Sequence, residues 1–310
     1  MSYHYHYDCS PSSASTVQDP IAEGFPAIRV DETLMRAVAV AVLALAVFLI
    51  VPLGREILRG AGPRSGPHRI AAGSFVIALS LAPGVGAWVF TLPWFLVCAV
   101  YAVSRGVRLL RTAPDLQLDA LAHTATATFL AVGAGAGGFA AAGWRPLGFA
   151  PIIVLLTAVH FHFAGFAFGV IAIRLRRDVS NVWTTLVIAG WMVGVPMVAL
   201  GITTRSTIEP AGAVMLATSG GLLGLLVLGR SVHHRSGWLA ISGASLCFAM
   251  VLAAGYALAQ QFGFGWLDIE IMERVHGIAN AFGFALCGLI GWSRIDRARL
   301  RKDQPLCVSP

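Results

Sequence analysis

The sequence predicts an all-α integral membrane protein, built as a helical bundle of about nine transmembrane helices. Hydrophobic residues make up 57% of the 310 residues and charged residues only 12%, whereas an average soluble domain has about 25% charged residues. The mean hydropathy is +0.75. Arginines gather in short clusters between long apolar runs, as the positive-inside rule expects of cytoplasmic loops. The net charge of +7 therefore reflects membrane topology, and no nucleic-acid partner is expected.

The apolar runs define the individual crossings, because a helix needs about 20 apolar residues to span the hydrocarbon core. The run 70–104 is too long for one crossing and contains the sequence APGVG, so we expect two short helices joined near Pro83–Gly86. The run 118–143 is rich in glycine and alanine, which allow neighbouring helices to approach closely. The remaining crossings are expected at 34–53, 149–173, 182–202, 211–228, 238–260 and 271–292.

The basic loops predict the orientation of these nine crossings. Most arginines lie in the loops 55–69, 105–117, 174–181 and 230–237 and after the last crossing. Nine crossings place all of them on one side, which predicts an outside N-terminus and a cytoplasmic C-terminus. Eight crossings, with 70–104 merged, would distribute the arginines over both sides. We therefore expect a multi-pass membrane protein, and the bias toward alanine, glycine and arginine indicates a GC-rich bacterial genome and hence the bacterial cell membrane.

Three parts follow from this arrangement. Residues 1–33 are polar and are expected to form a disordered tail, 34–293 to form the transmembrane domain, and 294–310 to form a basic cytoplasmic tail. Five cysteines are scattered without a CxxC pair, which indicates neither a disulfide framework nor a zinc site. The oligomeric state does not follow from the sequence.

The last crossing carries the most polar groups inside the membrane, where ionisable residues are costly and so mark functional candidates. Glu270, Glu273, His276 and Asn280 are spaced three, three and four residues apart. On an α-helix this spacing places all four on one face. A buried glutamate beside a histidine is suited to proton transfer near neutral pH. The alternative is a polar clamp that holds neighbouring helices together.

The fifth crossing contains two histidines in the sequence VHFHFAGFAFGV. His160 and His162 are about 200° apart on an ideal helix, so only one of them is expected to face a shared site, and His160 is preferred. Phe161 and Phe163, with Tyr256 on the eighth crossing and Glu270, are candidates for lining a substrate pocket. For the phenylalanines, packing is the competing interpretation.

Metal and cofactor sites receive less support. A single metal ion on His160, His162, Glu273 and His276 remains an alternative, whereas a di-metal centre would need more intramembrane carboxylates. His123, near the cytoplasmic start of the fourth crossing, is expected to be an interface histidine. No dinucleotide-binding, haem or flavin motif is present, so no cofactor is expected.

Two stretches, TAVHFHFAGFAFGV and VHGIANAFGFALCGLIGW, resemble the YndJ-like family of bacterial integral membrane proteins. The resemblance covers roughly residues 148–295 and rests on His160, His162, His276 and Asn280. It implies a multi-spanning helical fold and carries no assigned mechanism.

Acid–base residues without a cofactor favour a membrane-embedded enzyme whose partner is an apolar small-molecule substrate within the lipid bilayer. The chemistry best suited to these groups is epoxide opening or cation cyclisation or isomerisation of a terpenoid- or polyketide-like molecule, with epoxide hydrolysis less favoured. Glu273, His276 and His160 would transfer protons, and Asn280 would orient His276 or the substrate. The alternative is a transporter or exporter in which the same groups form a proton relay.

Overall fold

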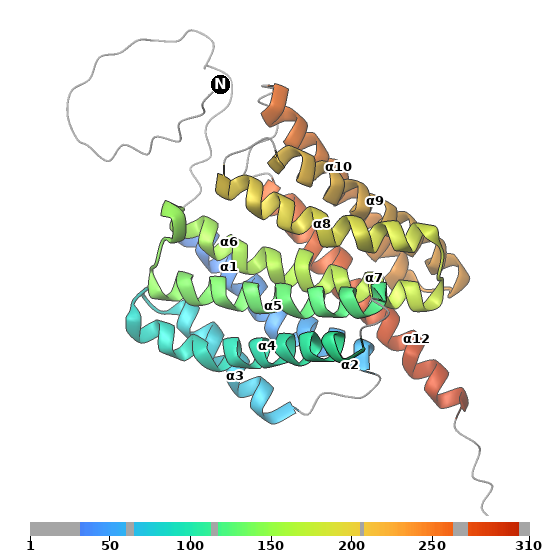
Figure 1. Cartoon of the computed structure of the whole chain (residues 1–310), viewed down its shortest axis with the longest axis horizontal. Helices are drawn as coiled ribbons and strands as arrows, with labels where there is room; N and C mark the ends of the chain where they lie inside the picture. The colour runs from blue at the N-terminus through green and yellow to red at the C-terminus, as the bar shows by residue number, and fades with distance from the viewer. Residues whose placement is uncertain (1–31, 60–64, 113–116, 205–207, 263–271, 304–310) are drawn as a thin grey trace, which may run out of the picture.

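The computed structural model describes residues 32–59, 65–112, 117–204, 208–262 and 272–303, which form a bundle of long helices without a strand in these ranges (Figure 1). The tail expected at 1–33 lies outside the described residues except for its last two positions. The all-α helical bundle predicted from the sequence is therefore confirmed for the described residues.

Nine passes follow one another along the chain, and several are built from more than one helical segment. The first combines α1 (Glu32–Leu45), η1 (Ala46–Ile50) and α2 (Val51–Arg59). The next are α3 (Ser65–Ser80), α4 (Val85–Thr112) and α5 (Leu118–Ala142), followed by a short 3₁₀ turn η2 (Pro146–Gly148). The fifth pass combines α6 (Pro151–His160), η3 (Phe161–Ala167) and α7 (Phe168–Asp178). The last four are α8 (Val182–Thr204), α9 (Ile208–His233), α10 (Gly237–Phe262), and the combination of η4 (Met272–His276), η5 (Ala279–Leu286) and α12 (Cys287–Asp303).

Eight of these passes are long and apolar enough to cross a membrane by themselves. The shorter α3, with 16 residues, spans about 24 Å at 1.5 Å per residue. Arg36, near the start of α1, donates hydrogen bonds to the carbonyls of Leu79 and Leu81 at the end of α3. The amide of Gly84 bonds to the carbonyl of Ala141 at the end of α5. These contacts require α3 to return the chain across the bundle, so the described residues make nine antiparallel passes.

The basic end of the bundle is the end at which α2, α4, α7, α9 and α12 finish. The last helix does not stop where the basic tail was expected to begin, because α12 continues to Asp303. Arg297, in this extension, bonds to Glu56 near the end of α2. Part of the expected tail at 294–310 is therefore a helix packed on the basic end.

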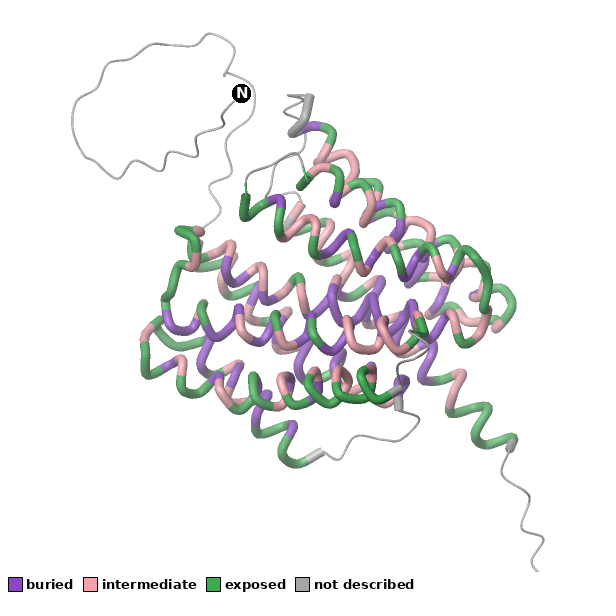
Figure 2. The backbone as a smooth tube through the Cα atoms, in the orientation of Figure 1, coloured by how far each residue is buried: buried purple, intermediate pink, exposed green. Residues whose placement is uncertain are grey.

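Small residues allow the passes to pack closely, as their abundance in the sequence suggests. The backbones of α9 and α10 meet at Gly224 and Gly243, where a Cβ on Gly243 would lie 2.6 Å from the Gly224 carbonyl oxygen. A Cβ on Gly169 would meet the ring of Trp191 at 2.6 Å. Buried residues follow the centre of the bundle in Figure 2, and exposed positions cover its periphery, where large apolar side chains would face lipid.

Candidate functional site

Three passes contain π-helical turns, and these turns meet inside the bundle. Segments η1, η3 and η5 contact one another pairwise, and we call this region the π junction. In a π turn, an amide bonds to the carbonyl five residues earlier, as the amide of Val51 does to Ala46 and that of Phe168 to Phe163. Such turns within α-helices are rare and occur frequently at functional sites. The spacing of apolar residues in the sequence gave no sign of them.

Side chains from neighbouring passes donate to carbonyls of the π junction. Nε2 of His68 lies 3.1 Å from the carbonyl oxygen of Val47, in η1. Nε1 of Trp191 donates to Ala164 in η3 at 2.7 Å, and the hydroxyl of Ser242 donates to Phe284 in η5 at 2.8 Å. Backbone groups at membrane depth need partners within the protein. These three donors therefore stabilise the altered winding.

His162 belongs to the packing of the π junction. Its side chain is fully buried, Nδ1 donates to the carbonyl of Ala158 at 2.8 Å, and Nε2 accepts from the indole of Trp94 at 3.3 Å. The rings of His162 and Trp94 are also stacked, with centroids 6.2 Å apart. Both ring nitrogens are thus engaged with α4 and α6, and His162 has no nitrogen left for a substrate or a metal ion.

His160 and His276 form the part of the candidate site that the structure brings together. The His160 side chain is exposed, although it lies midway along the fifth pass. The two imidazoles lie close enough to interact electrostatically. Nδ1 of His276 donates to the carbonyl of Ala249 on α10 at 2.9 Å. This bond fixes the neutral tautomer and leaves Nε2 of His276 as a proton acceptor.

The polar stripe expected on the ninth pass is described only in part. Glu270 lies outside the described residues, and Glu273 lies in η4 with a side chain that also falls outside the description. Because η4 and η5 wind as π-helices, the α-helical angles from which the stripe was derived do not apply to them. Asn280 contacts His276 through the backbone, since its amide donates to the His276 carbonyl at 2.9 Å. Asn280 thereby joins η4 to η5 and does not touch the imidazole through this bond.

The aromatic candidates for the substrate pocket differ in how far they are buried. Phe163 is buried, and Phe161 is half-buried with its ring 5.8 Å from that of Phe129. Tyr256 is half-buried on α10. His123 lies apart from this region and contacts a guanidinium nitrogen of Arg177 at 3.0 Å near the basic end.

The described side chains form no group of three or more histidine, cysteine, aspartate or glutamate residues that could hold a metal ion. The alternative metal set loses His162, because both of its nitrogens are engaged elsewhere. The carboxylate of Glu273, which would complete that set, is outside the described side chains. Among the described residues of the candidate site, the imidazoles of His160 and His276 are the groups that can accept or donate a proton near neutral pH.

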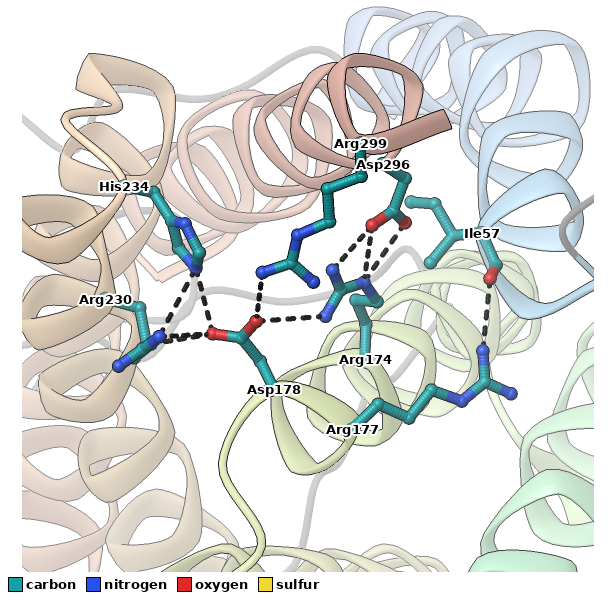
Figure 3. A network of polar contacts seen from close by, with 8 residues as sticks. All are labelled: Ile57, Arg174, Arg177, Asp178, Arg230, His234, Asp296 and Arg299. Atoms are coloured by element: carbon teal, nitrogen blue, oxygen red, sulfur yellow. Dashed lines mark hydrogen bonds and ion pairs between the residues drawn. The ribbon is translucent and has the colours of Figure 1, made fainter. Parts of the chain in front are cut away.

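Sequence analysis missed a second polar cluster, at the basic end (Figure 3). Asp178, at the end of α7, contacts Arg230 at 2.6 Å and His234 at 2.9 Å, and it pairs with Arg299 at 2.9 Å. Arg174 binds both carboxylate oxygens of Asp296 and packs over the ring of Trp292. The available signal was the aspartate directly after RLRR. A single carboxylate among many basic residues is expected to form ion pairs with them.

Comparison with known proteins identifies relatives of the chain. Residues 41–284 match the family model described as YndJ-like protein. The "Uncharacterized membrane protein YndJ" of Bacillus subtilis (strain 168) is 30% identical over 239 residues, which cover 73% of this chain and 41% of that protein. The chain thus spans less than half the length of this relative. No solved structure matches.

Proposed function

The chain belongs to the YndJ-like family of bacterial membrane proteins, and on that premise we propose that it is a membrane-embedded enzyme that uses acid–base catalysis on an apolar small molecule. The observation that carries the proposal is the pairing of an exposed His160 with His276 beside the π junction. A histidine exposed midway along a transmembrane helix is energetically costly. Catalysis on a substrate dissolved in the bilayer would explain why a polar side chain is exposed at this depth.

The hydrogen bonding of His276 and the exposure of His160 support separate proposed roles for the two imidazoles. His276 is the base, because its Nδ1–H is held by Ala249 and its Nε2 carries the free lone pair. Asn280 is a positioning residue, since it fixes the turn that carries His276. His160, whose ring is exposed, is the proton donor to the substrate. Glu273 is proposed to share this proton traffic from the same pass.

An internal epoxide opening fits this pair without any cofactor. The donor protonates the epoxide oxygen as a carbon–oxygen bond breaks, and an internal hydroxyl attacks that carbon and loses its proton to the base. Product and substrate are then isomers, and a proton shift between the two groups restores the enzyme. Terpenoid- or polyketide-like molecules are the proposed substrate class, because they are apolar enough to reach His160 from the lipid.

Comparative mass spectrometry of cells and medium tests the proposal. The strains express the wild type, His160→Gln, or His276→Asn, in which an amide nitrogen still donates to Ala249. The control is His162→Asn, which alters a histidine that has no free nitrogen. Protein abundance in the membrane fraction checks folding in each strain.

We expect His160→Gln and His276→Asn to accumulate a precursor isomeric with the normal product, while the control retains the product. Loss of one general acid or base typically lowers rates by about 10²–10⁴-fold. A precursor that differs by one water would indicate hydrolysis. If the variant cells make the normal product but retain it inside the cell, the protein is a transporter and the proposed enzymatic activity is refuted.

A further inference from the structure

A hollow in the surface lies at the end of the bundle opposite the basic end, where the chain turns from α5 toward α6 (Figure 1). Its volume is about 520 Å³. The hollow is lined by Phe139, Gly143, Trp144, Arg145 and Pro146. The apolar span of α5 ends at Ala142, just before these residues. The hollow would therefore lie at the level of the lipid headgroups, where aromatic side chains gather in membrane proteins.

The local sequence builds an aromatic surface beside this hollow. Gly143, with a left-handed φ of 72°, ends α5, and the amide of Trp144 then bonds back to the carbonyl of Phe139 at 3.0 Å. This motif brings the side chains at its two ends into contact, and the ring centres of Trp144 and Phe139 are 5.9 Å apart. The ring of Trp88, near the start of α4, stacks on Trp144 at 5.8 Å. Trp144 is still 49% exposed, so part of its surface is open to a ligand.

Arg145 gives the hollow one positive charge. The residue is exposed, and no ion pair or cation–π contact between described residues involves it. Its carbonyl accepts the amide of Gly148 at 3.0 Å, which closes a turn directly after Trp144. A guanidinium without a counter-charge in the described part of the chain is suited to bind a phosphate group.

Leu147, in the same turn, is an unusual residue for its backbone conformation. It has a left-handed φ of 56° and is 73% exposed. Glycine is favoured at such a position, because a Cβ is unfavourable there. The exposed side chain adds little to packing within the chain, so neither the backbone nor the packing accounts for a leucine. A contact with lipid does, and strained positions of this kind cluster at binding sites.

We propose that this hollow binds the headgroup of a zwitterionic glycerophospholipid, which carries a phosphate and an ammonium group. The phosphate would bind Arg145. The ammonium would lie against the exposed ring of Trp144, because a cation is attracted to the face of an indole. Leu147 would contact the acyl chains. An anionic lipid would engage the arginine alone and leave the aromatic surface without a charged partner. This inference does not rest on the proposed enzymatic activity.

Native mass spectrometry of the purified full chain in detergent tests the site. The probes are phosphatidylethanolamine, phosphatidylglycerol with the same acyl chains, and soluble phosphoethanolamine. We expect the wild type to retain phosphatidylethanolamine about fivefold better than phosphatidylglycerol, because only the former has an ammonium for the indole. We expect no binding of phosphoethanolamine, since the soluble headgroup lacks the chains that Leu147 contacts.

Two variants separate the contacts of the headgroup. Arg145→Gln should weaken the binding of both lipids about tenfold, because both carry the phosphate. Trp144→Leu should weaken phosphatidylethanolamine about fivefold and leave phosphatidylglycerol nearly unchanged. Trp183→Leu is the matched control, because Trp183 is 53% exposed but does not line the hollow. Arg235→Gln, exposed in the turn after α9, is the control for charge. Neither control should change lipid binding.

The proposal is overturned if the wild type retains phosphatidylglycerol as well as phosphatidylethanolamine, or if Arg145→Gln binds like the wild type. Equal losses in Trp144→Leu and Trp183→Leu would also overturn it. Phosphoethanolamine binding as tightly as the lipid would overturn the assignment to a lipid. If Trp144→Leu does not accumulate in the membrane, Leu147→Gly decides the question. This variant should melt at a higher temperature yet bind both lipids more weakly, and unchanged binding would count against the site.

Discussion

Replacing Asp178 by asparagine should destabilise the protein strongly, because this carboxylate joins three passes. Its side chain is only 3% exposed, yet it contacts Arg230 on α9, His234 in the turn directly after α9, and Arg299 on α12. Breaking a buried ion pair from one side costs about 3–5 kcal/mol, since the remaining charge loses its partner without gaining water. We expect Asp178→Asn to lower the free energy of unfolding by about 3 kcal/mol, at the lower end of this range, because the amide keeps some hydrogen bonds.

The exposed arm of the same cluster provides the matched control. The Arg299 side chain is 52% exposed, and exposed pairs contribute about 0–1 kcal/mol. Arg299→Gln should therefore cost less than about 1 kcal/mol. The measurement is equilibrium unfolding in mixed micelles of dodecyl maltoside and sodium dodecyl sulfate, followed by tryptophan fluorescence. Equal and small losses for both variants would refute the view that Asp178 is a buried junction between passes.

Three further predictions concern packing, the π junction and topology. Gly243→Ala should cost about 1–3 kcal/mol by overpacking against α9, whereas Gly229→Ala, with nothing within 4 Å of the new methyl group, should be neutral or stabilising in the same unfolding assay. Trp191→Phe should cost about 1–3 kcal/mol because it removes a buried donor to η3. The control Trp183→Phe, at an exposed position, should have little effect. Equal melting temperatures for the two variants would contradict the role of Trp191 in stabilising η3. Reporter fusions should place the C-terminus in the cytoplasm and an insertion at 144–148 outside, and the reverse result would exclude the orientation expected from the basic loops.

Much of the architecture was predictable because it depends on local composition. The split of the run 70–104 into two helices was correct, since APGVG gives α3 and α4 a turn at 81–84. Eight of the nine passes follow from apolar runs of membrane length, and the described arginine clusters lie at the end where α2, α4, α7, α9 and α12 finish. Several helices run past their expected ends, as α4 does to Thr112 and α7 to Asp178, and α12 continues to Asp303, where Arg297 bonds to Glu56 on α2.

The candidate site was predictable only in part. The sequence identified His160, His162, His276 and Asn280 as unusual for a membrane interior. It did not distinguish their roles, because the partner of His162 is Trp94, 68 residues away, and that of His276 is on another pass. The α-helical spacing used for Glu273 and Asn280 fails where the backbone winds as a π-helix.

The sequence by itself determined that this chain is a multi-pass membrane protein with most of its arginines near one end of the passes, because hydrophobicity and charge are properties of short segments and do not depend on how the passes pack. The tertiary structure decided which polar groups stabilise the fold and which are available for chemistry. A buried donor is stabilised by an acceptor, and that acceptor lies on a neighbouring pass for His68, Trp191, Ser242 and His276. His160 keeps its exposed ring because the described passes leave it uncovered beside His276, and only their packing determines this.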